Sequence, residues 1–94
     1  MKTRKEFDSI GSIKVPNDRY WGASTQRSKK YFNIGKIFVP IPIIRSIAII
    51  KRCAAIVHKK DKSISPRIAN SIIQASNEVI AGKMDQNFPL KVWQ

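Results

Sequence analysis

The sequence predicts a mainly α-helical fold, in which a short amino-terminal β-hairpin arm precedes a small helical domain. Two long segments, residues 42–60 and 65–82, carry isoleucine, valine and alanine at helical spacings of three and four. The polar connection between them is short, so the two helices are expected to be antiparallel neighbours. A shorter helix is expected within residues 18–35. The length of 94 residues allows one domain at most, so residues 1–94 are taken as part of a single amino-terminal domain.

The arm, residues 1–17, is expected to contain a hairpin over residues 7–15. Gly11 and Ser12 lie between two isoleucines and suit a two-residue turn. Pro16 is expected to end the second strand, because proline cannot donate to a strand ladder.

Residues 18–35 begin with a Trp-Gly block and continue into a helix of about two turns, expected over residues 24–32. Trp21 is expected to be packed against its surroundings. Gly22 is expected to permit a tight turn. Gly35 is expected to stop the short helix.

The helix expected over residues 42–60 is apolar on nearly every side. Pro42 is tolerated near its start, because the first-turn amides have no intrahelical partner. A helix of this kind is normally surrounded by protein, and a chain of this length has a thin core. We therefore expect the chain to be part of something larger or to associate. The main apolar row is Ile43, Ile47, Ile50, Ala54 and Val57, and the one polar stripe is Arg45, Arg52 and Lys59.

The helix expected over residues 65–82 has clear boundaries. Ser65 is expected to cap its amino terminus, Pro66 occupies the first helical position, and Gly82 stands just past the end. Residues 83–94 follow as a separate segment, whose apolar ending indicates a cut chain, since natural ends are usually frayed and polar. The apolar row of this helix is Ile68, Ile72, Ala75 and Val79.

Few residues offer chemistry. Cys53 is expected to be a small buried apolar residue instead of a reactive thiol. His58 is expected to be solvated at a helix end, where it suits the helix dipole. One cysteine and one histidine cannot make a zinc site, and no two carboxylates share a helix face. The sequence therefore predicts no catalytic, substrate-binding, cofactor-binding or metal-binding residue. The scattered acidic residues are Glu6, Asp8, Asp18, Asp61, Glu78 and Asp85.

The chain is strongly basic, with 18 Lys and Arg against 6 Asp and Glu and a formal net charge of +12. Such a charge is compatible with nucleic acid, an anionic membrane surface or an acidic protein partner. A stand-alone basic helical protein that binds nucleic acid is therefore an alternative, although no recognised nucleic-acid motif is present. The longest apolar run is too short and too polar to span a bilayer. The charged amino terminus shows no signal peptide, and the single thiol favours a reducing, cytoplasmic compartment.

The string from Asp18 to Ser28, Asp-Arg-Tyr-Trp-Gly-Ala-Ser-Thr-Gln-Arg-Ser, is a rare combination. This string and several further blocks, in this order and spacing, resemble the amino-terminal region of class II fumarases, the metal-independent fumarate hydratases of the fumarase/aspartase superfamily. Aspartases are the alternative within that superfamily, but they tend to carry tyrosine at the positions of Trp21 and Trp93. The further blocks are residues 11–16, 32–35, 44–55, 66–69, 77–83 and 88–94.

The resemblance implies the helical amino-terminal domain of a homotetrameric lyase that interconverts fumarate and (S)-malate in the tricarboxylic acid cycle without a cofactor. It implies as partners the rest of the fumarase chain and the other subunits, and neither a membrane nor nucleic acid. Residues 83–94 look like the lead-in to the family's first active-site segment. The family's catalytic histidine and serine, and its substrate-binding lysine and asparagine, have no matching position here. The resemblance therefore implies that the 94-residue chain is inactive alone.

Overall fold

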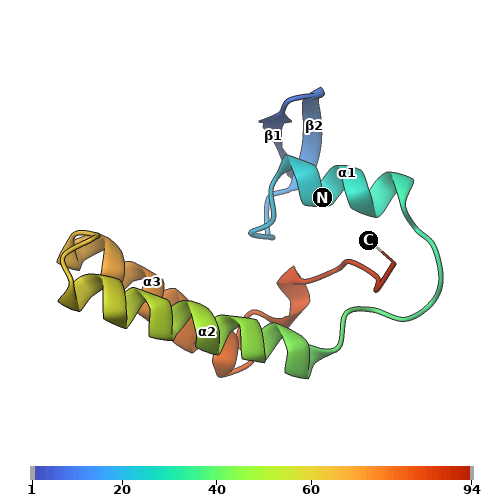
Figure 1. Ribbon diagram of the computed structural model, residues 1–94. Coiled ribbons are helices and arrows are strands. Elements are labelled where there is room, and N and C mark those ends of the chain that lie inside the picture. Colours follow the sequence, from blue (N-terminus) through green and yellow to red (C-terminus); the bar gives the residue numbers. More distant parts are fainter. Residues whose placement is uncertain (1, 94) are drawn as a thin grey trace. The chain divides into compact units, whose positions relative to one another are not determined.

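A computed structural model describes residues 2–93, and Figure 1 shows its elements. The prediction of a mainly helical fold with an amino-terminal hairpin is confirmed. Met1 and Gln94 lie outside the described residues, so the predictions for segments 1–17 and 83–94 are compared with the structure without these two residues. The elements in chain order are β1 (Thr3–Asp8), β2 (Gly11–Pro16), α1 (Ala23–Tyr31), α2 (Ile41–Lys60), α3 (Pro66–Ile80) and the short 3-10 helix η1 (Asp85–Asn87).

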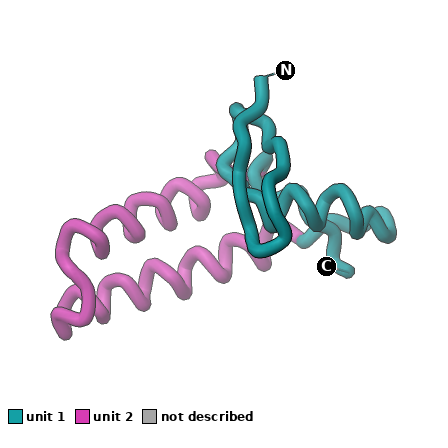
Figure 2. The backbone as a smooth tube through the Cα atoms, turned by 90° about the horizontal axis from the view of Figure 1, so that it is seen from above, with its two compact units in different colours: residues 1–39, 86–94 teal, residues 40–85 magenta. Residues whose placement is uncertain are grey.

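The chain divides into two compact units, coloured separately in Figure 2. The hairpin unit consists of Met1–Val39 together with Gln86–Gln94, and it contains β1, β2 and α1. The helix unit consists of Pro40–Asp85, and it contains α2 and α3.

The β1–β2 hairpin turns earlier than the sequence predicted. The innermost antiparallel pair is Asp8 with Gly11, so Ser9 and Ile10 form the turn and the predicted turn at Gly11 and Ser12 is wrong. The reason is local. The Asp8 carboxylate accepts hydrogen bonds from the amides of Ile10, at 3.0 Å, and Gly11, at 3.2 Å, as aspartate side chains commonly do in turns. Gly11 has φ +145°, a conformation that glycine adopts without strain.

The backbone at Gly22 also differs from the prediction. Gly22 is the N-cap of α1 with φ −102° and ψ −158°, an extended conformation open to any residue. A Cβ atom there would meet nothing within 4 Å. The expected tight turn at Gly22 is therefore wrong.

The two chain segments of the hairpin unit are joined by a short antiparallel pairing. Phe38 forms a β-bridge with Lys91. The amide of Val39 donates to the carbonyl of Leu90 at 3.1 Å, and the amide of Val92 donates to the carbonyl of Ile37 at 2.9 Å. These backbone bonds join residues 86–93 to the amino-terminal segment of the same unit.

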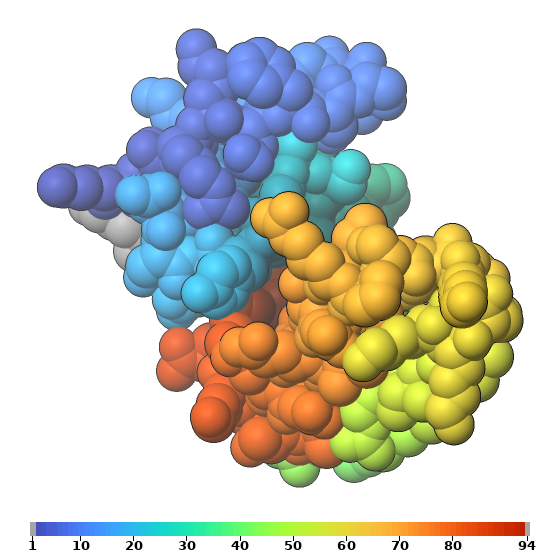
Figure 3. Space-filling model, turned by 90° about the vertical axis from the view of Figure 1, so that its left-hand side faces the viewer, coloured from blue at the N-terminus to red at the C-terminus, as the bar shows by residue number. Residues whose placement is uncertain are grey.

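The helix unit is an antiparallel pair, and the space-filling view shows the atoms of α2 and α3 in direct contact (Figure 3). Small buried side chains let the two helices approach closely. Two side-chain hydrogen bonds also bridge them: Arg52 to Asn77 at 2.9 Å and Lys59 to Asn70 at 2.8 Å. Neither helix, nor any other in the described part of the chain, is long and apolar enough to cross a membrane. The buried residues of the two helices are Ile44, Ala48, Ala55, Ala69 and Ser76.

The ends of α3 follow the sequence closely. The Ser65 hydroxyl accepts a hydrogen bond from the amide of Ile68 at 3.3 Å, which confirms the predicted N-cap. Gly82, with φ +85°, stands just past the carboxyl end, and its amide donates to the carbonyl of Val79 at 3.0 Å. This is the left-handed conformation with which helices commonly end.

Replacing Ser65 with alanine is expected to destabilise the helix unit by about 1 kcal/mol, because the first turn of α3 loses its side-chain acceptor. Urea unfolding followed by far-ultraviolet circular dichroism measures this loss. Ser71→Ala is the matched control: the Ser71 hydroxyl donates to the carbonyl of Arg67 within the helix, and its loss is expected to leave the midpoint unchanged or slightly higher. Equal midpoints for Ser65→Ala and the unaltered chain would contradict the assignment.

Candidate functional site

The segment from Asp18 to Ser28, singled out by the sequence, connects β2 to α1 in the hairpin unit (Figure 1). Most of its first half has no regular secondary structure, so its backbone carbonyls need partners from elsewhere. Arginine, tryptophan and asparagine side chains supply hydrogen bonds that fix this segment. These contacts form the candidate site, because they surround the most distinctive residues of the chain.

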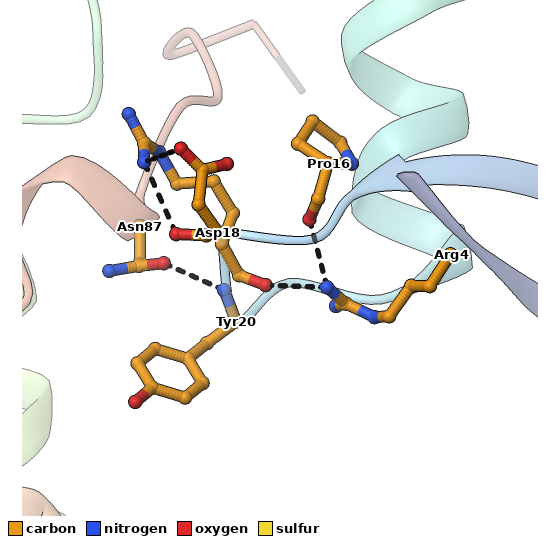
Figure 4. A network of polar contacts seen from close by, with 6 residues as sticks. Arg4, Pro16, Asp18, Tyr20 and Asn87 are labelled. Atoms are coloured by element: carbon orange, nitrogen blue, oxygen red, sulfur yellow. Dashed lines mark hydrogen bonds and ion pairs between the residues drawn. The ribbon is translucent and has the colours of Figure 1, made fainter. Parts of the chain in front are cut away.

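Arg4, on β1, is the centre of the first group of contacts (Figure 4). Its Nη1 donates to the carbonyls of Pro16 and Arg19, both at 2.8 Å, and its Nη2 donates to the carbonyl of Trp21 at 2.7 Å. Hydrogen bonds from a charged donor are shorter and stronger than neutral ones. One guanidinium therefore holds three points of the connection between β2 and α1.

Arg27, on α1, forms the second anchor through a two-pronged ion pair with Asp8. Nε lies 2.9 Å from Oδ2, and Nη2 lies 3.0 Å from Oδ1. Both side chains are largely covered, at 17% and 14% exposed. The pKa of Asp8 is lowered, mainly by the hydrogen bond from Arg27 and further by those from the turn amides. The pKa of Arg27 is raised by its hydrogen bond to Asp8. The pair ties the hairpin turn to α1.

Trp21 is buried, as predicted, and its contacts are specific. It is 9% exposed. The indole Nε1 donates to Oε1 of Gln26 at 2.8 Å, and Nζ of Lys29 lies 5.0 Å from the centroid of the indole ring. Burial of an indole with its N–H satisfied is favourable, so Trp21 fixes the start of α1.

Asn87 supplies the last anchor in Figure 4. Its Oδ1 accepts a hydrogen bond from the amide of Tyr20 at 2.8 Å, across 67 positions of sequence. Arg19 pairs with the neighbouring Asp18 at 3.1 Å. Near these contacts lies a hollow of about 380 Å³, whose lining residues are Arg4, Asn17, Asp18, Arg19 and Tyr20. Nη1 and Nη2 of Arg4 are engaged by backbone carbonyls, and its Nε lies 3.8 Å from Oε1 of Glu6, so this arrangement acts as a brace for the backbone.

The two reactive candidates lie elsewhere, in the helix unit. Cys53 is exposed, so the expected burial of this residue is wrong. The physical reason is that α3 covers α2 only on the side of Ile44, Ala48 and Ala55. His58 is exposed in the last turn of α2, as predicted, and its Nδ1 lies 3.7 Å from Oδ2 of Asp61. Within residues 2–93, no group of three or more metal-ligating side chains occurs.

The helix unit instead presents apolar surface. Most residues of the apolar row of α2 are exposed, including Ile50 at 66%. The row of α3 begins with Ile68, which is 54% exposed. Apolar rows of this length on a free surface indicate an interaction site. The exposed large residues of the two rows are Ile43, Ile47, Ile50, Val57, Ile68 and Ile72.

Sequence reasoning missed Arg4, Asp8 and Asn87 as anchors. Each acts across a long sequence separation on a backbone group or a single side chain, and no periodicity or local spacing marks such contacts. Asn87 is the last residue of η1, and the sequence gives no sign of its partner Tyr20.

A family profile described as "Lyase" matches residues 11–94. The class II fumarate hydratase of Methylorubrum extorquens is 47% identical over 100% of this chain and 20% of its own length. That of Thermosynechococcus vestitus is 48% identical over 98% of this chain and 20% of its own length. The chain spans about a fifth of the length of these relatives.

Solved structures give the same result. The class II fumarase from Schistosoma mansoni matches with a TM-score of 0.93 and 40% identity, covering 99% of this chain and 20% of that one. A fumarate lyase:delta crystallin from Brucella melitensis, in its native form, matches with a TM-score of 0.88 and 29% identity, covering 99% of this chain and 22% of that one. The resemblance to class II fumarases read from the sequence is confirmed.

Lowering the pH is expected to loosen the hairpin unit through Asp8. The ordinary pKa of an aspartate carboxyl is 3.8, and the pKa of Asp8 in the folded chain is lower. The Asp8–Arg27 pair therefore stabilises the fold fully above pH 3.8, and this stabilisation is lost as the pH falls through the lowered pKa. Urea unfolding followed by Trp21 fluorescence, in a Trp93→Phe background, measures the effect. Asp8→Asn is expected to lower the midpoint at neutral pH and to flatten its decline in acid. Asp18→Asn, which removes an exposed carboxylate, is the control and should show the same decline of the urea midpoint in acid as the unaltered chain. If the midpoints of Asp8→Asn and of the unaltered chain depended identically on pH, the stabilising role of Asp8 would be contradicted.

Proposed function

Because the chain belongs to the lyase family, we propose that it forms the amino-terminal helical part of a class II fumarate hydratase. The observation that carries this proposal is the 47% identity, over the whole chain, to the Methylorubrum extorquens enzyme of that name. The fold supports it, since the Schistosoma mansoni class II fumarase superimposes over 99% of the chain. The whole enzyme hydrates fumarate reversibly to (S)-malate.

In this proposal the 94 residues contribute structure to that reaction, and the rest of the enzyme supplies the chemistry. Hydration of fumarate requires groups that bind two carboxylates and exchange a proton with carbon, and their action must be stronger in the transition state. The carboxylates of the hairpin unit lie beside arginines: Glu6 with Arg4, Asp8 with Arg27 and Asp18 with Arg19. The single imidazole, His58, lies in an exposed last turn where water is not excluded. We therefore propose that the 94 residues are inactive alone, and that the described residues 2–93 supply no catalytic, substrate-binding, cofactor or metal site.

The wider setting follows from the same resemblance. The enzyme acts as a cytoplasmic homotetramer in the tricarboxylic acid cycle, and the partners of this chain are the rest of the fumarase and its neighbouring subunits. The exposed isoleucines of α2 and α3 support such partners, because apolar surface of this extent favours burial.

Fragment complementation tests the proposal. The Methylorubrum extorquens enzyme, without the segment that matches this chain, is co-expressed with the 94 residues in a host lacking its own fumarate hydratases. We expect fumarate consumption, followed by ultraviolet absorbance, from the pair and from neither part alone. Adding ammonium to the assay and measuring aspartate distinguishes an aspartase-like lyase, which would form aspartate from fumarate.

Two results would count against the proposal. Hydration of fumarate by the purified 94 residues would refute the inactivity of the chain. Failure of the pair, when the full-length relative and a control split of that relative at the same position are both active, would refute the role of this chain as the missing part.

A further inference from the structure

The two apolar rows of the helix unit lie on one side of the α2–α3 pair. Two residues along an α-helix correspond to a rotation of about 200°. Ile50 lies two positions before Arg52, and Ile68 lies two positions before Asn70. Arg52 and Asn70 are among the residues whose hydrogen bonds bridge the helices.

The other two residues that bridge the helices, Lys59 and Asn77, also lie two positions after a residue of the apolar rows. Val57 lies two positions before Lys59, and Ala75 lies two positions before Asn77. The bridges Arg52–Asn77 and Lys59–Asn70 therefore mark one side of the pair as polar. Both rows face the opposite side, and together they make a continuous apolar face.

The spacing of the α2 row is that of a helix–helix seam. Ile43, Ile47, Ile50, Ala54 and Val57 are separated by four, three, four and three residues. This is the heptad spacing at which one helix receives the side chains of another. Beside it, the α3 row at residues 68, 72, 75 and 79 repeats the pattern of four, three and four. The face thus carries two neighbouring apolar rows at this spacing, which suits a single amphipathic helix laid along them.

The charges on this face select the kind of helix. Lys51 and His58 are exposed beside the α2 row, one position after Ile50 and Val57. Within α2 and α3, Glu78 is the one acidic residue, against Arg45, Lys51, Arg52, Lys59, Lys60 and Arg67. Asp61, just past α2, already lies beside His58 and Ser63. A second copy of the unit would bring the same excess of positive charge, and like charges oppose association.

We propose that the apolar face of α2 and α3 binds one amphipathic α-helix that carries apolar residues at heptad spacing and carboxylates along its flanks. This inference rests on the proposed function for the source of the helix, which is the remainder of the lyase; the relatives are about five times as long as this chain. The apolar rows supply the buried contact, and Lys51 selects the acidic flank.

A designed peptide tests the face directly with the 94-residue chain. The probe is a three-heptad helix with leucine at the seam positions and glutamate at the flanking positions; its partner probe carries lysine at those flanks. Binding is measured by fluorescence anisotropy of the labelled peptide at low and physiological salt. We expect the acidic peptide to bind at least about tenfold more tightly than the basic one, with a smaller difference at higher salt.

Matched variants locate the binding surface. Ile50→Glu, in the centre of the α2 row, is expected to weaken binding at least about tenfold. Ile49→Glu is the control: Ile49 is also exposed, at 41%, but lies outside the row, and its variant should bind within about twofold of the unaltered chain. Circular dichroism confirms that both variants are folded, and Ile50→Thr gives a milder second test in the same direction.

Three results would overturn the inference. The first is that the Ile50→Glu variant binds the acidic peptide as tightly as the unaltered chain does. The second is that the unaltered chain binds the basic peptide as tightly as the acidic one. Sedimentation could instead show a dimer of the free chain that Ile50→Glu abolishes, which would assign the face to a second copy. Complementation of the truncated relative is scored separately, so a failure of peptide binding leaves the lyase assignment standing.

Discussion

The α2 helix has apolar side chains on more sides than one neighbouring helix can cover, and the rest of the account depends on this constraint. The buried residues of α2 are Ile44, Ala48 and Ala55, and the two alanines allow close approach but contribute little apolar area. Most of the other large apolar side chains of α2, such as Ile50, stay in water. Each square ångström of that surface would contribute roughly 25 cal/mol if it were buried. The helix unit is therefore shaped for a partner that completes its core.

The hairpin unit meets a different requirement. The connection between β2 and α1 has few backbone hydrogen bonds, and charged side chains add to them. Arg4 holds the carbonyls of Pro16, Arg19 and Trp21, and the Arg27–Asp8 pair fixes the hairpin turn. The residues that identify the family thus serve a structural purpose, with Trp21 buried at the entrance to α1.

Periodicity and capping made the helices predictable, because both act over a few residues. The α2 and α3 rows and the Ser65 cap were visible in the sequence. The hairpin turn was misplaced because the Asp8 side chain, and not the Gly-Ser pair, organises the amides that follow it. Cys53 was misjudged because burial depends on which side the neighbouring helix covers. The Asn87 contact with Tyr20 spans 67 positions, and a single sequence holds no sign of such a pairing.

Hydrogen–deuterium exchange tests the central claim most directly. The 94 residues are compared alone and together with the Methylorubrum extorquens enzyme from which the matching segment has been removed. A helix unit completed by the rest of the lyase predicts that amides of Ile41–Lys60 and Pro66–Ile80 exchange measurably more slowly in the mixture than in the free chain, since their opening then requires the partner to leave. Equal exchange of both helices, with the two proteins shown to be associated, would contradict the claim.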